Sequence, residues 1–421
     1  MQFLREVLPN GLEIIAEITP SAISTSIGFF VKTGARDETP HEAGVSHFLE
    51  HMVFKGTESM TGEEINRRFD DIGAAANAFT SEEYTVYHAA VLPQQQRTTV
   101  ELLAPLMRPA LRESDFITEK LVILEEIRMY DDQPPFGADD RCRAAFFGSH
   151  PLASSVLGTV ESIEALPVEL MRDYHRRRYS PTNVVLVASG AVHFDDLVQS
   201  GKSLCGHWEP VDAPRRTLPA EPHGGLQHIV RTSGAQTYMV RFSSGPDGSH
   251  PLRHAAMLLA NVLGDDSGSR LYWELIDSGE AEHAECHYHE YLDAGVFVTQ
   301  VGCAPEDAAD VQKRIEEIYA RAMKHGIEPA ELERARNKIA TRVAMAGERP
   351  RQRLFQVGLE WSHSGRYRSA SDDLTLVEQL TMNDIELVMA TWPLDRLAMT
   401  LIAGPSGETV RRPFSSDGSE N

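Results

Sequence analysis

The apolar and polar residues of this chain follow one order of helix and strand patterns twice. In the first half, the patterns predict a helix over 61–71, strands over 76–80 and 84–92, and helices over 100–107 and 116–130. A capping box at Thr61 to Glu64 starts the first of these helices. In the second half, they predict helices over 254–263 and 269–276, strands over 284–291 and 296–301, and helices over 311–324 and 330–346. The repetition indicates an internal duplication.

The length of the chain agrees with this duplication, because 421 residues suffice for two domains of about 200 residues, each with its own core. We expect an α/β fold of the α+β kind, in which each domain is a mainly antiparallel sheet packed with helices. The predicted domains cover 1–210 and 226–408, joined by a linker over 211–225 that is rich in Pro, Gly and charge. The polar tail over 409–421 is expected to be disordered.

Composition narrows the class of protein. The formal net charge of −22 argues against nucleic acid and anionic membranes as partners, since those require clustered Lys and Arg. No basic apolar leader and no run of 18 apolar residues is readable, so we expect a cytoplasmic protein. The four cysteines form no C-x-x-C pair, which favours buried free thiols over a zinc knuckle or a disulfide framework.

The stretch from His47 to His51 carries the clearest chemistry. On a helix, His47, Glu50 and His51 share one face, because they stand at i, i+3 and i+4. Neutral imidazoles bind zinc, and a carboxylate one turn away can take a proton from water. Solvated helix faces also carry His and Glu, but the apolar residues that follow, Met52 to Phe54, indicate a buried helix. Burying these three side chains is costly unless they are paired or bind a metal.

Catalytic zinc usually has three protein ligands, so a third is needed. The run from Phe116 to Tyr130 is strongly helical and contains several carboxylates. By composition either Glu125 or Glu126 could be the ligand. Glu119 and Glu126 lie two turns apart on one face, which would supply a ligand and a supporting carboxylate. We therefore choose Glu126 and read Glu125 as a solvated residue.

These motifs resemble the insulinase/pitrilysin (M16) family of zinc peptidases, in the half-length subgroup that includes the mitochondrial processing peptidase and bacterial relatives. The likeness extends over most of the chain, at 8–12, 44–57, 77–80, 119–127, 150–152, 158–159, 179–183 and 269–271. The chain departs from the family pattern at 153–156 and 264–268, which concerns substrate contacts rather than the metal.

The resemblance implies roles for individual residues. His47, His51 and Glu126 would bind one Zn²⁺ per chain, with Glu50 as the general base and Glu119 as a supporting carboxylate. Asn77, Ala78 and Phe79 match a sheet edge on which an extended peptide pairs as an added strand; a plain hairpin strand is the alternative. The second half has no matching metal site, because His254 stands alone on its helix and 337–339 contain no carboxylate.

The implied function is a zinc-dependent metalloendopeptidase that hydrolyses peptides or unfolded segments in a closed chamber. A homodimer is the expected assembly, with a heterodimer of related subunits as the alternative. The competing function is a non-catalytic partner or scaffold subunit of a peptidase-like complex, a state that follows when metal residues decay. All four metal-site residues are present here, which favours the enzyme.

A second group of histidines, His283, His287 and His289, could also be read as a metal cluster. Strand alternation places His287 and His289 on one face. We favour a polar cavity wall over a metal site at this position.

Overall fold

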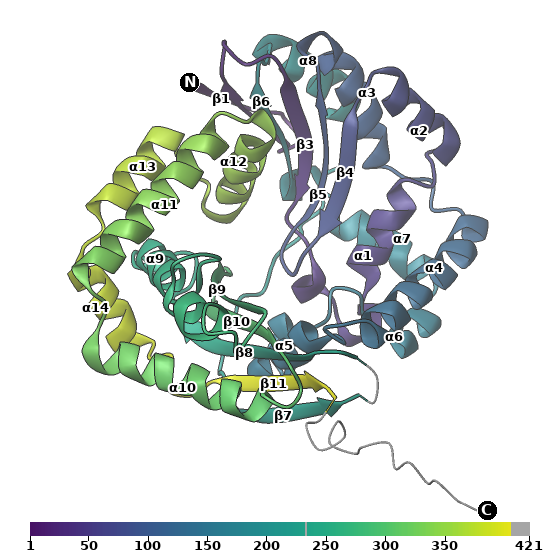
Figure 1. Ribbon diagram of the computed structural model, residues 1–421. Coiled ribbons are helices and arrows are strands. Elements are labelled where there is room, and N and C mark those ends of the chain that lie inside the picture. Colours follow the sequence, from purple (N-terminus) through teal and green to yellow (C-terminus); the bar gives the residue numbers. More distant parts are fainter. Residues whose placement is uncertain (232–233, 406–421) are drawn as a thin grey trace, which may run out of the picture. The chain divides into compact units, whose positions relative to one another are not determined.

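The computed structural model describes residues 1–231 and 234–405, which form two compact units (Figure 1). The first unit combines residues 1–127, 154–216 and 340–376. The second combines residues 128–153, 217–231, 234–339 and 377–405. No helix within the described residues has both the length and the apolar character needed to cross a membrane.

The first unit is built on a six-stranded sheet. In spatial order its strands are β1 (Gln2–Val7), β2 (Glu13–Ile18), β6 (Val184–Gly190), β3 (Thr25–Val31), β5 (Thr85–Val91) and β4 (Ala75–Thr80). All neighbours pair antiparallel except β2 and β6, which are parallel. Strand β4 is an edge of this sheet, as the predicted substrate strand requires.

Helices cover both faces of the first sheet. They are α1 (Val45–Val53), α2 (Gly62–Asp71), α3 (Gln96–Leu106), α4 (Glu113–Asp132), α6 (Val160–Ala165), α7 (Val168–Arg178), α8 (Phe194–Cys205) and α12 (Pro350–Ser364). Ile27 and Phe29 of β3 enter the core that contains α1 and α3, whereas Phe30 enters the core that contains α12. This split follows from the alternation of side chains along a strand.

The second unit repeats the first in topology. Its strands, in spatial order, are β7 (Gly225–Val230), β11 (Met399–Gly404), β8 (Thr237–Gly245), β10 (Gly295–Cys303) and β9 (His283–Glu290). Only β7 and β11 are parallel, as are β2 and β6 in the first unit. The order therefore matches β2-β6-β3-β5-β4, and the predicted fold of two similar, mainly antiparallel α/β domains is confirmed.

The helices of the second unit include one departure from the prediction. They are α5 (Ala138–Phe147), α9 (Arg253–Gly264), η6 (Tyr272–Ile276), α10 (Ala308–His325) and α14 (Met382–Thr391). Two more helices, α11 (Pro329–Gly347) and α13 (Ala370–Gln379), each contain a point where the chain passes between the units, as does α4 between Ile127 and Arg128. The helix predicted over 269–276 is a π-helix over its last five residues.

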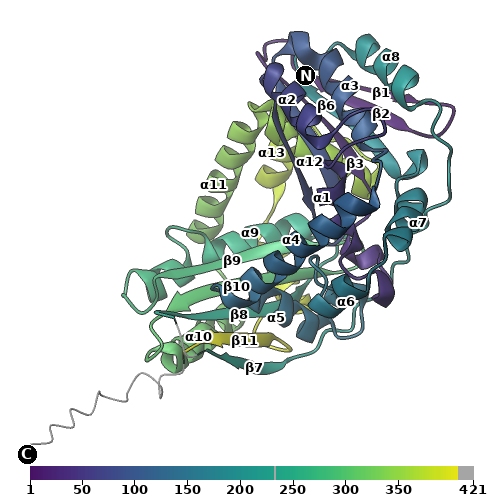
Figure 2. The same cartoon turned by 90° about the vertical axis from the view of Figure 1, so that its right-hand side faces the viewer.

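Two helices belong to the unit opposite to their half of the sequence. Helix α5 packs on β8 and β11, although it comes from the first half. Helix α12 packs on β3 and β6, although it comes from the second half, and Figure 2 shows it beside β3. The domain bounds at 210 and 226 stay a prediction, because they describe the duplicated halves of the sequence. The compact units differ from these halves at α5 and α12. The predicted tail over 409–421 lies outside the described residues.

The four cysteines, Cys142, Cys205, Cys286 and Cys303, are all buried and free, as predicted.

A buried ion pair fastens α12 to the first sheet. The Arg353 guanidinium donates from Nε to Oε1 of Glu17 at 2.8 Å and from Nη2 to Oε2 at 2.5 Å. The Tyr367 hydroxyl donates to the same carboxylate at 2.8 Å. Glu17 is 0% exposed and Arg353 is 1% exposed, so each charge depends on the other for its stability.

We expect Arg353→Ala to lower the free energy of unfolding by about 3–5 kcal/mol, because it leaves the Glu17 carboxylate buried without its counter-charge. Arg366→Ala is the matched control, since Arg366 is exposed; its effect should stay within about 0.5 kcal/mol. Urea unfolding followed by circular dichroism measures both. Equal effects of the two substitutions would contradict the importance of the pair.

Candidate metal centre

Helix α1 carries the candidate metal residues, and a residue that precedes the helix forms hydrogen bonds to its first turn. Its N-cap is Gly44, whose φ of 87° favours glycine and which has no side chain to cap the helix. The Glu38 carboxylate replaces that cap, accepting hydrogen bonds from the backbone N–H of Gly44 and of Ser46 at 2.7 Å each. These bonds satisfy two free backbone donors of the first turn.

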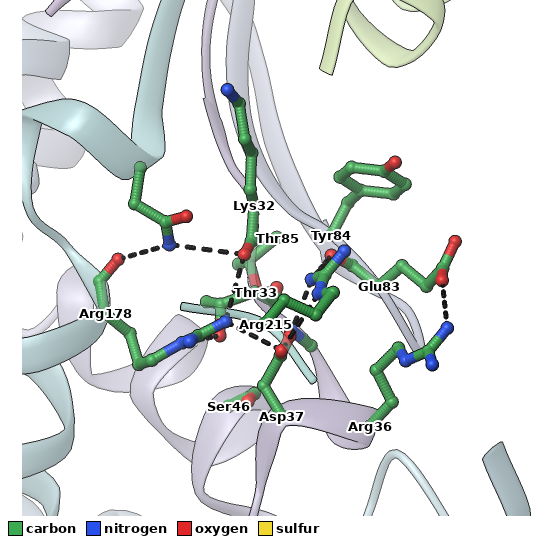
Figure 3. A network of polar contacts seen from close by, with 12 residues as sticks. Lys32, Thr33, Arg36, Asp37, Ser46, Glu83, Tyr84, Thr85, Arg178 and Arg215 are labelled. Atoms are coloured by element: carbon green, nitrogen blue, oxygen red, sulfur yellow. Dashed lines mark hydrogen bonds and ion pairs between the residues drawn. The ribbon is translucent and has the colours of Figure 1, made fainter. Parts of the chain in front are cut away.

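A polar network beneath this turn connects it to the rest of the first unit (Figure 3). The Ser46 and Tyr174 hydroxyls lie 2.7 Å apart, and Tyr174 in turn lies 3.0 Å from the Thr33 hydroxyl. Asp37, next to Glu38, lies between two guanidinium groups, at 2.7 Å from Arg178 and 2.6 Å from Arg215. Buried polar groups with several partners hold one conformation, so the start of α1 is well defined.

Helix α4 packs beside α1 through residues at helical spacing. The rings of Phe48 on α1 and Phe116 on α4 stack with centroids 4.6 Å apart. Ile123 and Ile127 on α4 are buried in the same core as α1. Glu119 and Glu126 fall between these apolar residues, so the packing that buries α4 also turns both carboxylates toward α1.

The predicted ligands converge. Oε2 of Glu126 lies 3.7 Å from Nε2 of His47 and 3.7 Å from Nε2 of His51. Donor atoms about 2.0–2.1 Å from a tetrahedral zinc stand roughly 3.3–3.4 Å from one another, so small side-chain shifts would complete the coordination. Within residues 1–231 and 234–405, these three side chains are the only group of its kind that could hold a metal.

Glu119 orients one of the two imidazoles. Its Oε1 lies 2.9 Å from Nδ1 of His51, and its Oε2 lies 2.5 Å from the Lys55 ammonium. The bond to Nδ1 leaves Nε2 of His51 facing Glu126, which is the arrangement of a carboxylate behind a metal-binding histidine. Glu119 thus contacts a ligand rather than the space between the ligands, and it is a positioning residue.

The electrostatics of the site favour a divalent cation. Three carboxylates, Glu50, Glu119 and Glu126, gather here with one ammonium, Lys55. Burial raises the pKa of Glu126, with His51 opposing and Glu119 adding to the rise. Burial, helped by the neighbouring His51, lowers the pKa of His47 to about 4, so its imidazole is neutral at neutral pH. Zn²⁺ binds neutral imidazole nitrogens and carboxylate oxygens, and the excess of carboxylates over ammonium groups here attracts a cation.

Glu50 lies next to the ligands but is held by a different contact. Its Oε2 accepts a hydrogen bond from the Thr80 hydroxyl at 2.6 Å. Burial raises the pKa of Glu50, and the bond from Thr80 opposes that rise. Thr80 is the last residue of β4, so this bond joins the metal helix to the edge strand that carries Asn77, Ala78 and Phe79.

The remaining predicted positions differ from this centre. Glu125 is exposed on α4. On β9, His283 and His287 are 54% and 52% exposed, and each pairs with Glu285 at 3.0 Å. They lie on the polar face of an edge strand, and the polar cavity wall that we favour there stays a prediction.

Comparison with known proteins identifies the family. Residues 13–160 match the family model described as Insulinase (Peptidase family M16), and residues 165–339 match the one described as Peptidase M16 inactive domain. The chain is 31% identical over 416 residues to an uncharacterized zinc protease of Mycobacterium tuberculosis, covering 97% of this chain and 94% of that protein. The chain belongs to the insulinase (peptidase M16) family.

Two further similar proteins agree with this assignment to the M16 family. The uncharacterized zinc protease YmxG of Bacillus subtilis is 30% identical over 384 residues, which cover 90% of each chain. The crystal structure of a protease from Helicobacter pylori superposes with a TM-score of 0.91 at 22% identity, covering 96% of this chain and 100% of that one. This last similarity concerns the fold. The names of the relatives support a zinc protease of the half-length M16 type.

Three contacts of this centre were missed by sequence reasoning. In the sequence, Thr80 and Lys55 stand out only as members of the ranges 77–80 and 44–57. Glu38 belongs to none of the motifs. Glu38 reaches the helix from the turn that precedes it. A Glu shortly before a helix whose N-cap is Gly could have suggested it.

We expect the purified M16 protein to bind about one Zn²⁺ per chain, because the described residues contain one group of three ligands. Glu126→Ala should lose the metal, whereas Glu125→Ala, with its exposed side chain on the same helix, should keep it. Elemental analysis after gel filtration measures both. The reverse result would show that Glu125 is the ligand.

Proposed function

We propose that this protein is a zinc-dependent metalloendopeptidase that hydrolyses peptides or unfolded segments. The observation that carries the proposal is the convergence of His47, His51 and Glu126 with Glu50 beside them. A structural zinc site would use a fourth protein ligand and would have no use for a carboxylate outside the ligand set. The zinc protease names of the relatives support the same function.

The residues of this site divide the chemistry among them. His47, His51 and Glu126 would hold the zinc, which when bound polarises a carbonyl group and lowers the pKa of water. Glu50 accepts the proton of the attacking water on its carboxylate and later delivers it to the leaving amine. Thr80 holds one oxygen of Glu50 and leaves the other for this transfer. Glu119 keeps the tautomer and orientation of His51.

The edge strand β4 supplies the substrate contact in this proposal. Its pairing partner is β5 on one side only, so the backbone groups of its other side can pair with an extended peptide. The side chains of Asn77, Ala78 and Phe79 lie along the strand that ends at Thr80, next to Glu50. Backbone pairing demands little of the substrate sequence, which suits hydrolysis of varied peptides.

We expect Glu50→Gln to lower kcat by roughly two to four orders of magnitude, because an amide of the same size cannot accept the proton. Zinc content and the circular dichroism spectrum should stay those of the wild type. A fluorogenic peptide measures the rate. Cleavage near the wild-type rate would show that Glu50 is not the base.

We also propose that two chains associate and enclose the metal centres in a chamber that selects substrates by size. The long members of the resembling family have four such domains, and this chain has half that number. Apolar side chains on α4 support an interface: Ile117, Leu121 and Val122 are 59%, 63% and 47% exposed. A second copy of the chain would bury them.

We expect a dimer by light scattering, and we expect Leu121→Asp to shift it toward monomer, because a charge in an apolar interface is costly. Leu92→Asp is the matched control, since Leu92 is 56% exposed directly after β5 in the same unit. The dimer should cleave a short peptide but not a compact folded protein. A fully active monomer at micromolar concentration, or equal cleavage of both substrates, would contradict the chamber.

A further inference from the structure

A second candidate site lies in the first unit, at the end of the sheet where α12 begins. A cavity of about 380 Å³ is lined by the turn before β3, by Ser26 and Ala90 on the sheet, and by residues 348–351. This volume exceeds that of one water molecule by roughly tenfold, and it falls within the range of small-ligand sites. None of the residues assigned to the metal centre lines this cavity.

Hydrogen bonds and close packing hold the segments that line the cavity in place. The N–H of Ala191 donates to the Ser24 carbonyl at 3.0 Å, and the Thr25 hydroxyl donates to the Ala191 carbonyl at 2.7 Å. Gly190 has a φ of 105°, and a Cβ there would approach Ser24 and Pro350 to 2.3 and 2.9 Å. Only glycine therefore lets the end of β6 meet the start of α12 this closely. The site is pre-formed by backbone contacts.

The donors that line this cavity are cationic or unsatisfied. Arg349 and Arg351 bring two guanidinium groups, against one carboxylate from Glu348. Arg349 is the N-cap of the 15-residue helix α12, where the helix dipole favours anions, and no acidic residue stands in its first turn. Pro350 at N1 has no N–H, and the N–H of Gln352 donates to the Arg349 carbonyl at 3.0 Å, so the two guanidinium groups are the main donors here. A cavity with this charge is unexpected in a chain whose net charge is −22.

An independent observation also indicates a ligand. Ser26 is 1% exposed and lines the cavity, yet its hydroxyl has no hydrogen-bond partner within the described residues. Its register partner on β6, Ser189, is likewise buried with an unpartnered hydroxyl. Buried polar atoms in proteins are nearly always hydrogen-bonded, so an unpartnered buried hydroxyl on a residue that lines a cavity indicates a site for a bound group.

We propose that this cavity binds an oxyanion, the carboxylate or phosphate group of a small ligand, through Arg349, Arg351, the first turn of α12 and the Ser26 hydroxyl. Guanidinium groups recognise both oxyanions through paired hydrogen bonds. The ligand has two sources with this shared chemistry: a free anion, or the C-terminal carboxylate of a peptide. The peptide source rests on the proposed function, whereas the free anion does not.

The register of the sheet is compatible with the peptide source. Ala90, which lines the cavity, pairs with Ala75 at the start of β4, while Thr80 at its end contacts Glu50. Five residues of strand separate these two ends, about 17 Å at 3.3 Å per residue. A peptide paired antiparallel with β4 would have its N-terminal side near the metal centre and its C-terminus toward the cavity.

Calorimetric titration of the full chain with inorganic phosphate tests the site without zinc or turnover. We expect saturable binding that weakens about tenfold in Arg349→Gln and in Arg351→Gln, since each removes a charged donor. Glu348→Gln should tighten binding, and Arg366→Gln, beyond the far end of α12, should leave it unchanged. These side chains are exposed, so the variants should fold; circular dichroism verifies this.

The source of the anion is decided with two peptides that differ only in a C-terminal acid or amide, bound to the Glu50→Gln chain. Tighter binding of the acid, lost in Arg351→Gln, supports the peptide carboxylate. Equal binding of both, together with phosphate binding, supports a free anion. No phosphate binding and no preference for the acid would overturn the proposal, as would equal weakening in Arg366→Gln. Loss of peptidase activity alone would affect only the proposed function.

Discussion

Burial of a polar helix face is the constraint on which the first unit depends. Helix α1 must place two imidazoles and a carboxylate inside the protein while its other side packs into the core. Each polar group there needs a partner, because an unpaired buried charge or donor costs several kcal/mol. Glu119 supplies one for His51, Thr80 supplies one for Glu50, and Glu38 supplies one for the first turn. Nδ1 of His47 has none within the described residues, so this side chain depends most on the ligand set.

These partners come from separate parts of the chain, and together they align the site. Glu38 lies in the turn before the helix, Thr80 on the edge strand, and Glu119 on α4. The bond between Thr80 and Glu50 joins the proposed base to the proposed substrate strand, so a shift of either would move the other. Catalytic groups need positions accurate to a fraction of an ångström, and packed, doubly connected elements provide that accuracy better than loops.

Much of the centre was predictable because its signals are periodic. His47, Glu50 and His51 follow helical spacing, and Glu126 is preferred over Glu125 because it lies two turns from Glu119 on the same helix face. The repeated order of elements likewise predicted two sheets of one topology. Contacts between distant segments were not predictable, since no spacing encodes them: Arg353 on Glu17, and the place of α12. Local pattern indicates which face a helix buries, but not which sheet buries it.

The exchange of α5 and α12 makes the two sequence halves interdependent. One face of the first sheet, with Phe30 and Val187, is covered by Leu354 and Val357 of α12, from the second half. The first half alone would expose this apolar face and leave Glu17 without Arg353. Duplication therefore did not produce two separable modules. It produced one chain in which α12, from the second half, completes the core of the unit that carries the candidate metal centre. The turn that leads into α12 also provides the cationic wall of the cavity beside Ser26.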